Sequence, residues 1–307
     1  MDQHELTERQ SDLDPASPEE FRIPVTGGGL AVLRWPARRA DAPVVLALHG
    51  ITANALSWAR VAHHLAGQVT LVAPDLRGRA GSGTVAGPWG LDAHADDVVA
   101  LLDALGLERA VVAGHSMGAF VSVLTAARHP DRVASLVLVD GGLGIPAPAG
   151  LDGDELIAAV LGPAMHRLSM TFADRAAYRS FWQAHPAFGA AWSPWVDAYI
   201  QRDLVGEEPE LRSSCRLEAV RADARQLFAA PILDAIRELA CPAELLWADR
   251  GLLDEPQGLY DRRRLTAADL DSTGVVPLRV AGTNHYTILI ADPGAAVVAR
   301  RITAAAY

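Results

Sequence analysis

The sequence is poor in lysine, in cysteine and in long apolar runs. It has no lysine, so its 27 basic residues are all arginine, and 37 acidic residues give a formal net charge of −10. This balance argues against nucleic acid or an anionic membrane as the main partner. The two cysteines, Cys215 and Cys241, are too few and too far apart for a disulfide framework or a metal cluster. No other metal-ligand spacing occurs, so we expect no metal and no cofactor.

The apolar runs are too short to cross a membrane, because a spanning helix needs about 18 consecutive apolar residues. The first residues are acidic and polar and lack the basic and apolar regions of a signal peptide. We therefore expect a cytoplasmic protein without a membrane partner. Residues 1–18 are expected to form a flexible tail. The sequence indicates no oligomeric state.

Short β-branched runs alternate with amphipathic stretches in the first half of the chain. The runs lie at 43–50, 68–75, 109–116 and 133–142, and the amphipathic stretches at 55–67, 92–106 and 117–130. Because these runs are apolar on both faces, they predict parallel strands covered by helices on both sides. Residues 21–35 predict a hairpin. Further strands are expected at 241–249 and 275–282, and a final helix at 291–305.

A helical segment rich in tryptophan and proline interrupts this pattern and contains no clear strand. The predicted organisation is therefore an α/β core formed by residues 19–145 and 236–307, with a helical cap formed by residues 146–235.

The stretch Gly114-His115-Ser116-Met117-Gly118 lies between a predicted strand and a predicted helix. A strand-to-helix turn flanked by small residues can expose a serine as a nucleophile at the start of the helix. The N–H of Met117 can then stabilise an oxyanion. A second donor is expected at Ile51, because Gly50 before it allows backbone to approach a ligand closely. His49 and His115 are interpreted as structural, His115 as a buried spacer.

His285 is the candidate base for Ser116, because it follows the last predicted strand and precedes the last helix. Asn284 is expected to shape its loop. The acid that orients the imidazole should follow the carboxyl end of a strand. Asp140 ends the run SLVLVD, 24 residues after Ser116, and is the favoured candidate. Asp249 and Asp254 follow a later strand and remain open as alternatives.

Taken in order, HGIT, DLRGRAGS, GHSMG, LVLVDGG and GTNHY resemble the α/β-hydrolase superfamily over nearly the whole chain outside the tail. The resemblance implies a mostly parallel eight-stranded sheet with a cap inserted over the site. In the commoner arrangement the acid lies in the later loop, within G-x-x-D, but here that loop reads ADRG. An acid after the earlier strand is similar to that of haloalkane dehalogenases and zearalenone-type lactonases. A serine at position 116 disfavours the dehalogenases and the epoxide hydrolases, which use an aspartate nucleophile.

The cap is expected to form an apolar roof for the substrate. Candidate substrate-binding residues are Leu143, Trp182, Trp192 and Tyr286. The cap contains no arginine cluster that would bind a phosphate. The predicted activity is hydrolysis of an ester or lactone of a small hydrophobic molecule through an acyl-enzyme on Ser116. Carbon–carbon bond hydrolysis of a diketone, cofactor-free perhydrolysis and slow-turnover ligand reception remain alternatives.

Overall fold

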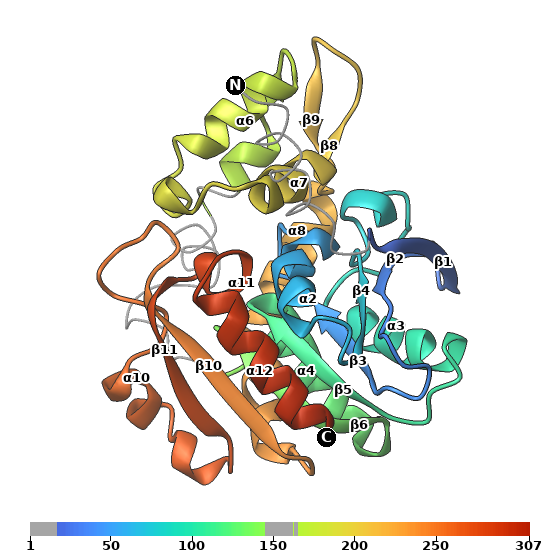
Figure 1. Cartoon of the computed structure of the whole chain (residues 1–307), viewed down its shortest axis with the longest axis vertical. Coiled ribbons are helices and arrows are strands. Elements are labelled where there is room, and N and C mark those ends of the chain that lie inside the picture. Colours follow the sequence, from blue (N-terminus) through green and yellow to red (C-terminus); the bar gives the residue numbers. More distant parts are fainter. Residues whose placement is uncertain (1–16, 145–161, 163–164) are drawn as a thin grey trace.

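The main sheet contains eight strands in the order β1-β2-β4-β3-β5-β6-β10-β11. A computed structural model describes residues 17–144, 162 and 165–307 (Figure 1). Strands β3 to β6, β10 and β11 pair in parallel, whereas β1 pairs with β2, and β2 with β4, in antiparallel. The strand bounds are Glu19–Val25, Gly28–Trp35, Val44–Leu48, Thr70–Pro74, Ala110–His115, Val133–Val139, Ala243–Arg250 and Val276–Asn284. The predicted hairpin and mostly parallel eight-stranded sheet are confirmed.

Both faces of the central strands β3 to β6 are buried, which explains why these strands are apolar at nearly every position. In β3, Leu46 and Leu48 belong to one hydrophobic cluster, whereas Val45 and Ala47 belong to the other. Helices α3 (Leu91–Ala104) and α4 (Met117–Arg128) cover the first face. Helices α2 (Ala59–Leu65), α11 (Thr287–Ile290) and α12 (Gly294–Ala306) cover the second (Figure 1). This arrangement confirms the expected helices on both faces.

The segment between β6 and β10 contains helices α6 (Arg175–Gln183), α7 (Pro194–Arg202), α8 (Leu217–Leu227) and α9 (Ala230–Asp234). Helices α6 and α7 lie beyond one end of the main sheet (Figure 1). The expectation that this segment has no strand is wrong. It holds a small antiparallel sheet formed by β7 (Thr171–Phe172), β9 (Leu211–Ser213) and β8 (Leu204–Val205). Strands of two or three residues are too short to show an alternating pattern.

Two predicted regions fall partly outside the described residues: the predicted tail at residues 1–16, and the predicted cap at residues 146–161, 163 and 164. Strand β1 begins at Glu19. Further helical elements include α10 (Arg262–Ala267) and short 3-10 turns at Ala55–Trp58 (η1), Ala80–Ser82, Pro130–Arg132, Gly189–Ala191, Ala235–Glu238 and Leu270–Ser272. Within the described residues, no helix has the length and apolar character needed to cross a membrane.

The sheet brings three distant parts of the chain to one edge. His115, the last residue of β5, is in register with Val139, the last residue of β6. Val139 is in turn in register with Leu246 of β10, which pairs in parallel with β11. Because parallel strands end at the same edge, Ser116, Asp140 and His285 follow neighbouring carboxyl ends.

Candidate active site

Ser116 occupies a strained turn between β5 and α4. Its backbone has φ 54° and ψ −123°, a combination that is costly for a residue with a side chain. The Ser116 N–H donates to the Val139 carbonyl at 3.0 Å, which ties the turn to β6. Helix α4 begins at Met117, and the first N–H groups of a helix have no acceptor within it. The sequence GHSMG therefore folds into a turn that presents a partly exposed serine at a helix N-terminus.

The two glycines of this turn are required by close backbone packing. A Cβ at Gly118 would lie 2.3 Å from the Leu48 carbonyl oxygen of β3, and a Cβ at Gly114 would lie 2.3 Å from the Gly118 carbonyl oxygen. Neither neighbour is a flexible side chain, so no larger residue fits without moving the backbone. These contacts hold Ser116 close to the loop that follows β3.

His285 and Asp140 form a buried pair. The His285 Nδ1 lies 2.7 Å from Asp140 Oδ2, and because a carboxylate accepts, Nδ1 carries the proton. The other Asp140 oxygen accepts from the Ala248 N–H at 3.1 Å, and the Asp140 N–H donates to the Leu246 carbonyl at 2.7 Å. With Nδ1 engaged, the Nε2 of His285 is left to accept a proton. Ser116 and His285 line the same pocket.

The alternative acids have other partners. Asp249 accepts from the Arg279 guanidinium and from the Gly282 N–H, and its hydrogen bond with Arg279 lowers its pKa. Asp254 accepts from Arg250 and from Asn284, and the hydrogen bond with Arg250 is the main cause of its lowered pKa. Neither carboxylate contacts the His285 imidazole. The structure therefore brings Asp140 to the base, and not Asp249 or Asp254.

The loop after β3 is held from two sides. His49 accepts from the Leu76 N–H at Nε2, across 2.9 Å, and donates from Nδ1 to the Gly50 carbonyl, across 2.8 Å. Burial lowers the pKa of His49 to about 3, so its ring is neutral. The structural role predicted for His49 is confirmed. The Gly50 carbonyl also accepts from the Ala53 N–H at 3.1 Å. In a trans peptide, fixing this carbonyl turns the Ile51 N–H to the opposite side.

This loop passes directly beside the serine. A Cβ at Gly50 would lie 3.2 Å from the Cβ of Ser116 and 3.6 Å from its Oγ. The Ile51 carbonyl accepts from the Nε of Arg79 at 2.9 Å, and Arg79 is itself buried and paired with Asp223. Ile51 and Met117 lie on either side of Ser116. Their backbone N–H groups are therefore placed where they can donate to an oxyanion.

His115 is more than a buried spacer. Its Nε2 donates to the backbone carbonyl of His285 at 2.8 Å, and the two rings lie 4.7 Å apart. Burial, reinforced by the neighbouring His285, lowers the pKa of His115 well below its usual value. The residue before the serine therefore holds the backbone of the histidine, a contact that local sequence does not reveal.

Asn284 fixes the histidine loop, as the sequence predicted. Its Oδ1 accepts from the N–H groups of Tyr286 and Thr287 at 3.0 and 2.8 Å, which orders the start of α11. Its Nδ2 donates to the Ala187 carbonyl at 2.9 Å, so the inserted segment also holds this loop.

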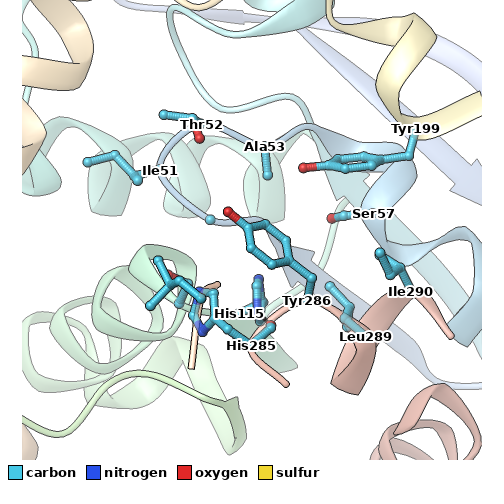
Figure 2. Close-up of a pocket in the computed structure, with 13 residues that line it drawn as sticks. Ile51, Thr52, Ala53, Ser57, His115, Tyr199, His285, Tyr286, Leu289 and Ile290 are labelled. Atoms are coloured by element: carbon cyan, nitrogen blue, oxygen red, sulfur yellow. Dashed lines mark hydrogen bonds between the residues drawn. The ribbon is translucent and has the colours of Figure 1, made fainter. Parts of the chain in front are cut away.

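The pocket at this site has a volume of about 50 Å³ (Figure 2). Of the four predicted substrate-binding residues, only Tyr286 is among the described residues that line it. Trp182 packs against Phe188 and Arg167 in the inserted segment, Trp192 packs against the second hydrophobic cluster, and Leu143 is buried against Tyr260. Trp182 and Leu143 are buried and Trp192 is partly buried, so a substrate-binding role for these three residues stays a prediction. The lining is Gly50, Ile51, Thr52, Ala53, Ser57, His115, Ser116, Tyr199, Leu252, His285, Tyr286, Leu289 and Ile290.

Sequence reasoning did not single out several of these positions. Ser57 belongs to no motif, and Tyr199 is one of many aromatic residues between β6 and β10, so no pattern separates it from the aromatic residues that pack as core there. Among the residues that the structure covers, no group of His, Cys, Asp and Glu side chains is arranged to hold a metal ion.

Large parts of this chain are similar in sequence to known proteins. The family model described as the alpha/beta hydrolase fold matches residues 43–261. Lipase LipV of Mycobacterium tuberculosis is 40% identical over 168 residues, which are 52% of this chain and 57% of LipV. A putative carbamate hydrolase, RutD of Caulobacter segnis, is 38% identical over 35% of this chain and 40% of its own length. The matched regions thus span about half of these curated relatives.

Solved structures match over almost the whole chain. E-2-(acetamidomethylene)succinate hydrolase superposes with a TM-score of 0.77 at 22% identity, covering 94% of this chain and 98% of its own. The enol-lactonase of Burkholderia xenovorans superposes with a TM-score of 0.67 at 19% identity, covering 93% of this chain and 99% of its own. At this level of identity the likeness establishes the fold.

Proposed function

The chain belongs to the α/β-hydrolase fold family, and from that premise we propose that it is a serine hydrolase acting on a carboxylic ester or lactone of a small hydrophobic molecule. One observation carries the proposal. A serine in a strained turn opens into the same pocket as a histidine whose Nδ1 is bonded to a fully buried aspartate. A nucleophile, a base that takes its proton and an acid that orients the base together catalyse acyl transfer in many unrelated proteins.

In the proposed mechanism, Ser116 Oγ attacks the substrate carbonyl while His285 Nε2 takes its proton. The Asp140 carboxylate stabilises the imidazolium that forms, and the N–H groups of Ile51 and Met117 receive the oxyanion. Collapse of this intermediate breaks the ester bond, and His285 protonates the departing alkoxide. Water, deprotonated by His285, then attacks the acyl-enzyme and releases the carboxylic acid and Ser116. These steps need no cofactor.

The lining of the pocket supports a small, uncharged substrate. Leu252, Leu289 and Ile290 contribute apolar surface, and the described lining contains no arginine, aspartate or glutamate. This lining suits an uncharged acyl or alkyl group. We therefore propose a small molecule as the partner, and neither nucleic acid nor membrane.

The named relatives support hydrolysis but differ in the bond that they cleave. They include a lipase, an enol-lactonase and a putative carbamate hydrolase. Among these substrate classes, a carboxylic ester or lactone best fits a serine nucleophile in an apolar pocket. Amides, carbamates and diketones belong in the same substrate panel, because each carries a carbonyl carbon that Ser116 Oγ could attack.

Active-site labelling tests the core of the proposal. A fluorophosphonate probe should add to Ser116, as mapped by peptide mass spectrometry, and the adduct should be absent from the Ser116→Ala variant. The same two proteins should then be assayed with short p-nitrophenyl esters, lactones, carbamates and diketones. Absence of an adduct at Ser116 in folded protein would overturn the serine mechanism. An adduct without turnover of any substrate would instead favour a ligand receptor of this fold.

A further inference from the structure

Three hydroxyl groups line the pocket without a hydrogen-bond partner among the described residues. The Oγ of Ser57 is buried, and its side chain makes no hydrogen bond. Within the described part of the chain, the phenol groups of Tyr199 and Tyr286 also lack a hydrogen-bond partner. Figure 2 shows the oxygens of Ser57 and Tyr199 pointing into the same space beside Ala53, with the Tyr286 phenol directed toward that space from below. We call Ser57, Tyr199 and Tyr286 the hydroxyl cluster.

The cluster is assembled from three elements that are separately fixed. Ser57 lies in the 3-10 turn η1 (Ala55–Trp58), and Tyr199 lies in helix α7 of the insertion. The Tyr199 carbonyl accepts from the Nδ2 of Asn54 at 2.9 Å, which joins α7 to the loop before η1. Tyr286 follows His285, and its ring packs against Phe188 at 5.0 Å. The hydroxyls are therefore held in place by backbone and ring contacts that do not use the oxygens themselves.

A buried hydroxyl without a partner is costly, by roughly 1–3 kcal/mol for each group. The Ser57 Oγ is such a group, and it faces a cavity that the buried Tyr199 and the partly buried Tyr286 also line, which indicates that something within the cavity supplies its hydrogen bond. Ser57 and Tyr199 lie apart from the reacting centre, because Figure 2 shows them on the side of the pocket away from His115 and His285, whereas the Tyr286 ring lies 5.5 Å from the His285 ring.

The electrostatics of the cavity restrict the group that fits there. Burial raises the pKa of both Tyr199 and Tyr286, so each phenol keeps its proton and can donate at neutral pH. The cation that acts on both phenols, Arg167, is itself buried and paired with Asp203. An anion would lose its hydration without gaining a free counter-charge, which is unfavourable. An uncharged oxygen would gain hydrogen bonds without that cost.

We propose that the hydroxyl cluster is a substrate subsite that binds an uncharged oxygen acceptor, such as a ketone or ether oxygen, on the part of the substrate away from the scissile carbonyl. This inference rests on the proposed hydrolase function and narrows its substrate class. The substrate is then a small ester or lactone that is apolar along its length but carries one neutral oxygen function at its far end.

Matched esters test the subsite on each side of the scissile bond. On the acyl side, p-nitrophenyl levulinate is compared with p-nitrophenyl pentanoate, which lacks the ketone. On the alcohol side, methoxyethyl acetate is compared with butyl acetate, in which carbon replaces the ether oxygen. After correction for spontaneous hydrolysis, the wild type should prefer the oxygen-bearing member of at least one pair in kcat/KM. Tyr199→Phe and Ser57→Ala should each reduce that preference about five-fold, the value of one hydrogen bond.

The control is Tyr307→Phe, which removes a phenol that is bonded to the Gln68 carbonyl on the surface. It should leave the preference of the wild type unchanged. The subsite is wrong if the wild type, Tyr199→Phe and Ser57→Ala all show the same ratio of kcat/KM between the two members of each ester pair.

A binding measurement separates failure of the subsite from failure of the hydrolase proposal. Tetrahydrofuran and cyclopentane have the same ring size and differ by one oxygen, and their binding to Ser116→Ala can be followed by NMR titration. The variant should bind tetrahydrofuran more tightly, and adding Tyr199→Phe should remove the difference. If that difference is present but no ester is hydrolysed by the wild type, the subsite stands and the hydrolase proposal fails. If it is absent, the subsite is wrong whatever the enzyme hydrolyses.

Discussion

The Nε2 of His115 donates a hydrogen bond to the backbone carbonyl of His285 across 2.8 Å. The residue directly before the candidate nucleophile thus holds the backbone of the candidate base, 170 positions later in the chain. Asp140 fixes the imidazole of His285 and His115 fixes its main chain, so the ring is constrained from two directions. Catalysis by a general base depends on such placement, because small displacements of the base are costly to the rate.

Replacing His115 should therefore slow the chemical step. We expect His115→Leu to lower kcat about ten-fold with little change in KM, because the His285 backbone loses one hydrogen bond and shifts. His115→Gln retains a side-chain N–H and should recover most of the loss. Steady-state kinetics over a range of pH check this, since a displaced His285 should also change the pH profile of kcat/KM. Equal activity of the Leu and Gln variants would contradict a positioning role.

Replacing Asp140 should be far more damaging than replacing Asp254. Asp140→Asn removes the acceptor that keeps the His285 proton on Nδ1, and we expect kcat to fall by about three to four orders of magnitude. Asp254→Asn, whose carboxylate is bonded to Arg250 and Asn284, should stay within about three-fold of the wild type. Turnover of a p-nitrophenyl ester measures both. A larger loss in Asp254→Asn than in Asp140→Asn would reverse the assignment.

The sequence predicted the parts of the site that are built from local patterns. Ser116 is marked by the glycines around it, and His285 and Asp140 by their places after predicted strands. Other contacts depend on tertiary packing that no local pattern records. Trp182 and Tyr199 are both buried aromatics of the insertion, yet Trp182 packs on Phe188 while Tyr199 lines the pocket. The bond from His115 to His285 was missed for the same reason, because it joins residues that only the sheet brings together.

The turn between β5 and α4 should tolerate no side chain at Gly118. A Cβ there would lie 2.3 Å from the Leu48 carbonyl oxygen, so Gly118→Ala must move α4 away from β3. We expect a loss of about 3 kcal/mol in the free energy of unfolding and no labelling of Ser116 by a phosphonate probe. Urea unfolding and probe labelling measure the two effects. Gly189→Ala is the control, because a Cβ at Gly189 meets no atom within 4 Å. Similar stability of the two variants would contradict this account of the turn.

The stability of the protein should fall steeply as the pH drops from about 7 to about 5, because two buried histidines are neutral in the fold. Burial lowers the pKa of His49 to about 3 and that of His115 well below its usual value. In the unfolded chain both titrate near pH 6.5. Below about pH 6.5 the unfolded state therefore binds protons that the folded state does not. Stability is complete above that pH and is lost as the pH falls, by at most about 1.4 kcal/mol per pH unit for each histidine.

Burial opposes the ionisation of Asp223, but Arg79 and His94 outweigh it and lower the pKa of this carboxyl to about 2. Its contribution is lost only as the pH falls below about 4, outside the range in which the histidines act. Urea unfolding at about pH 7, 6 and 5 isolates the histidine effect. His115→Gln removes one of the two buried imidazoles. The slope of its unfolding free energy against pH should therefore be smaller, by at most about 1.4 kcal/mol per pH unit, the value for one proton. The same slope in the wild type and the variant would show that His115 takes up its proton within the folded state.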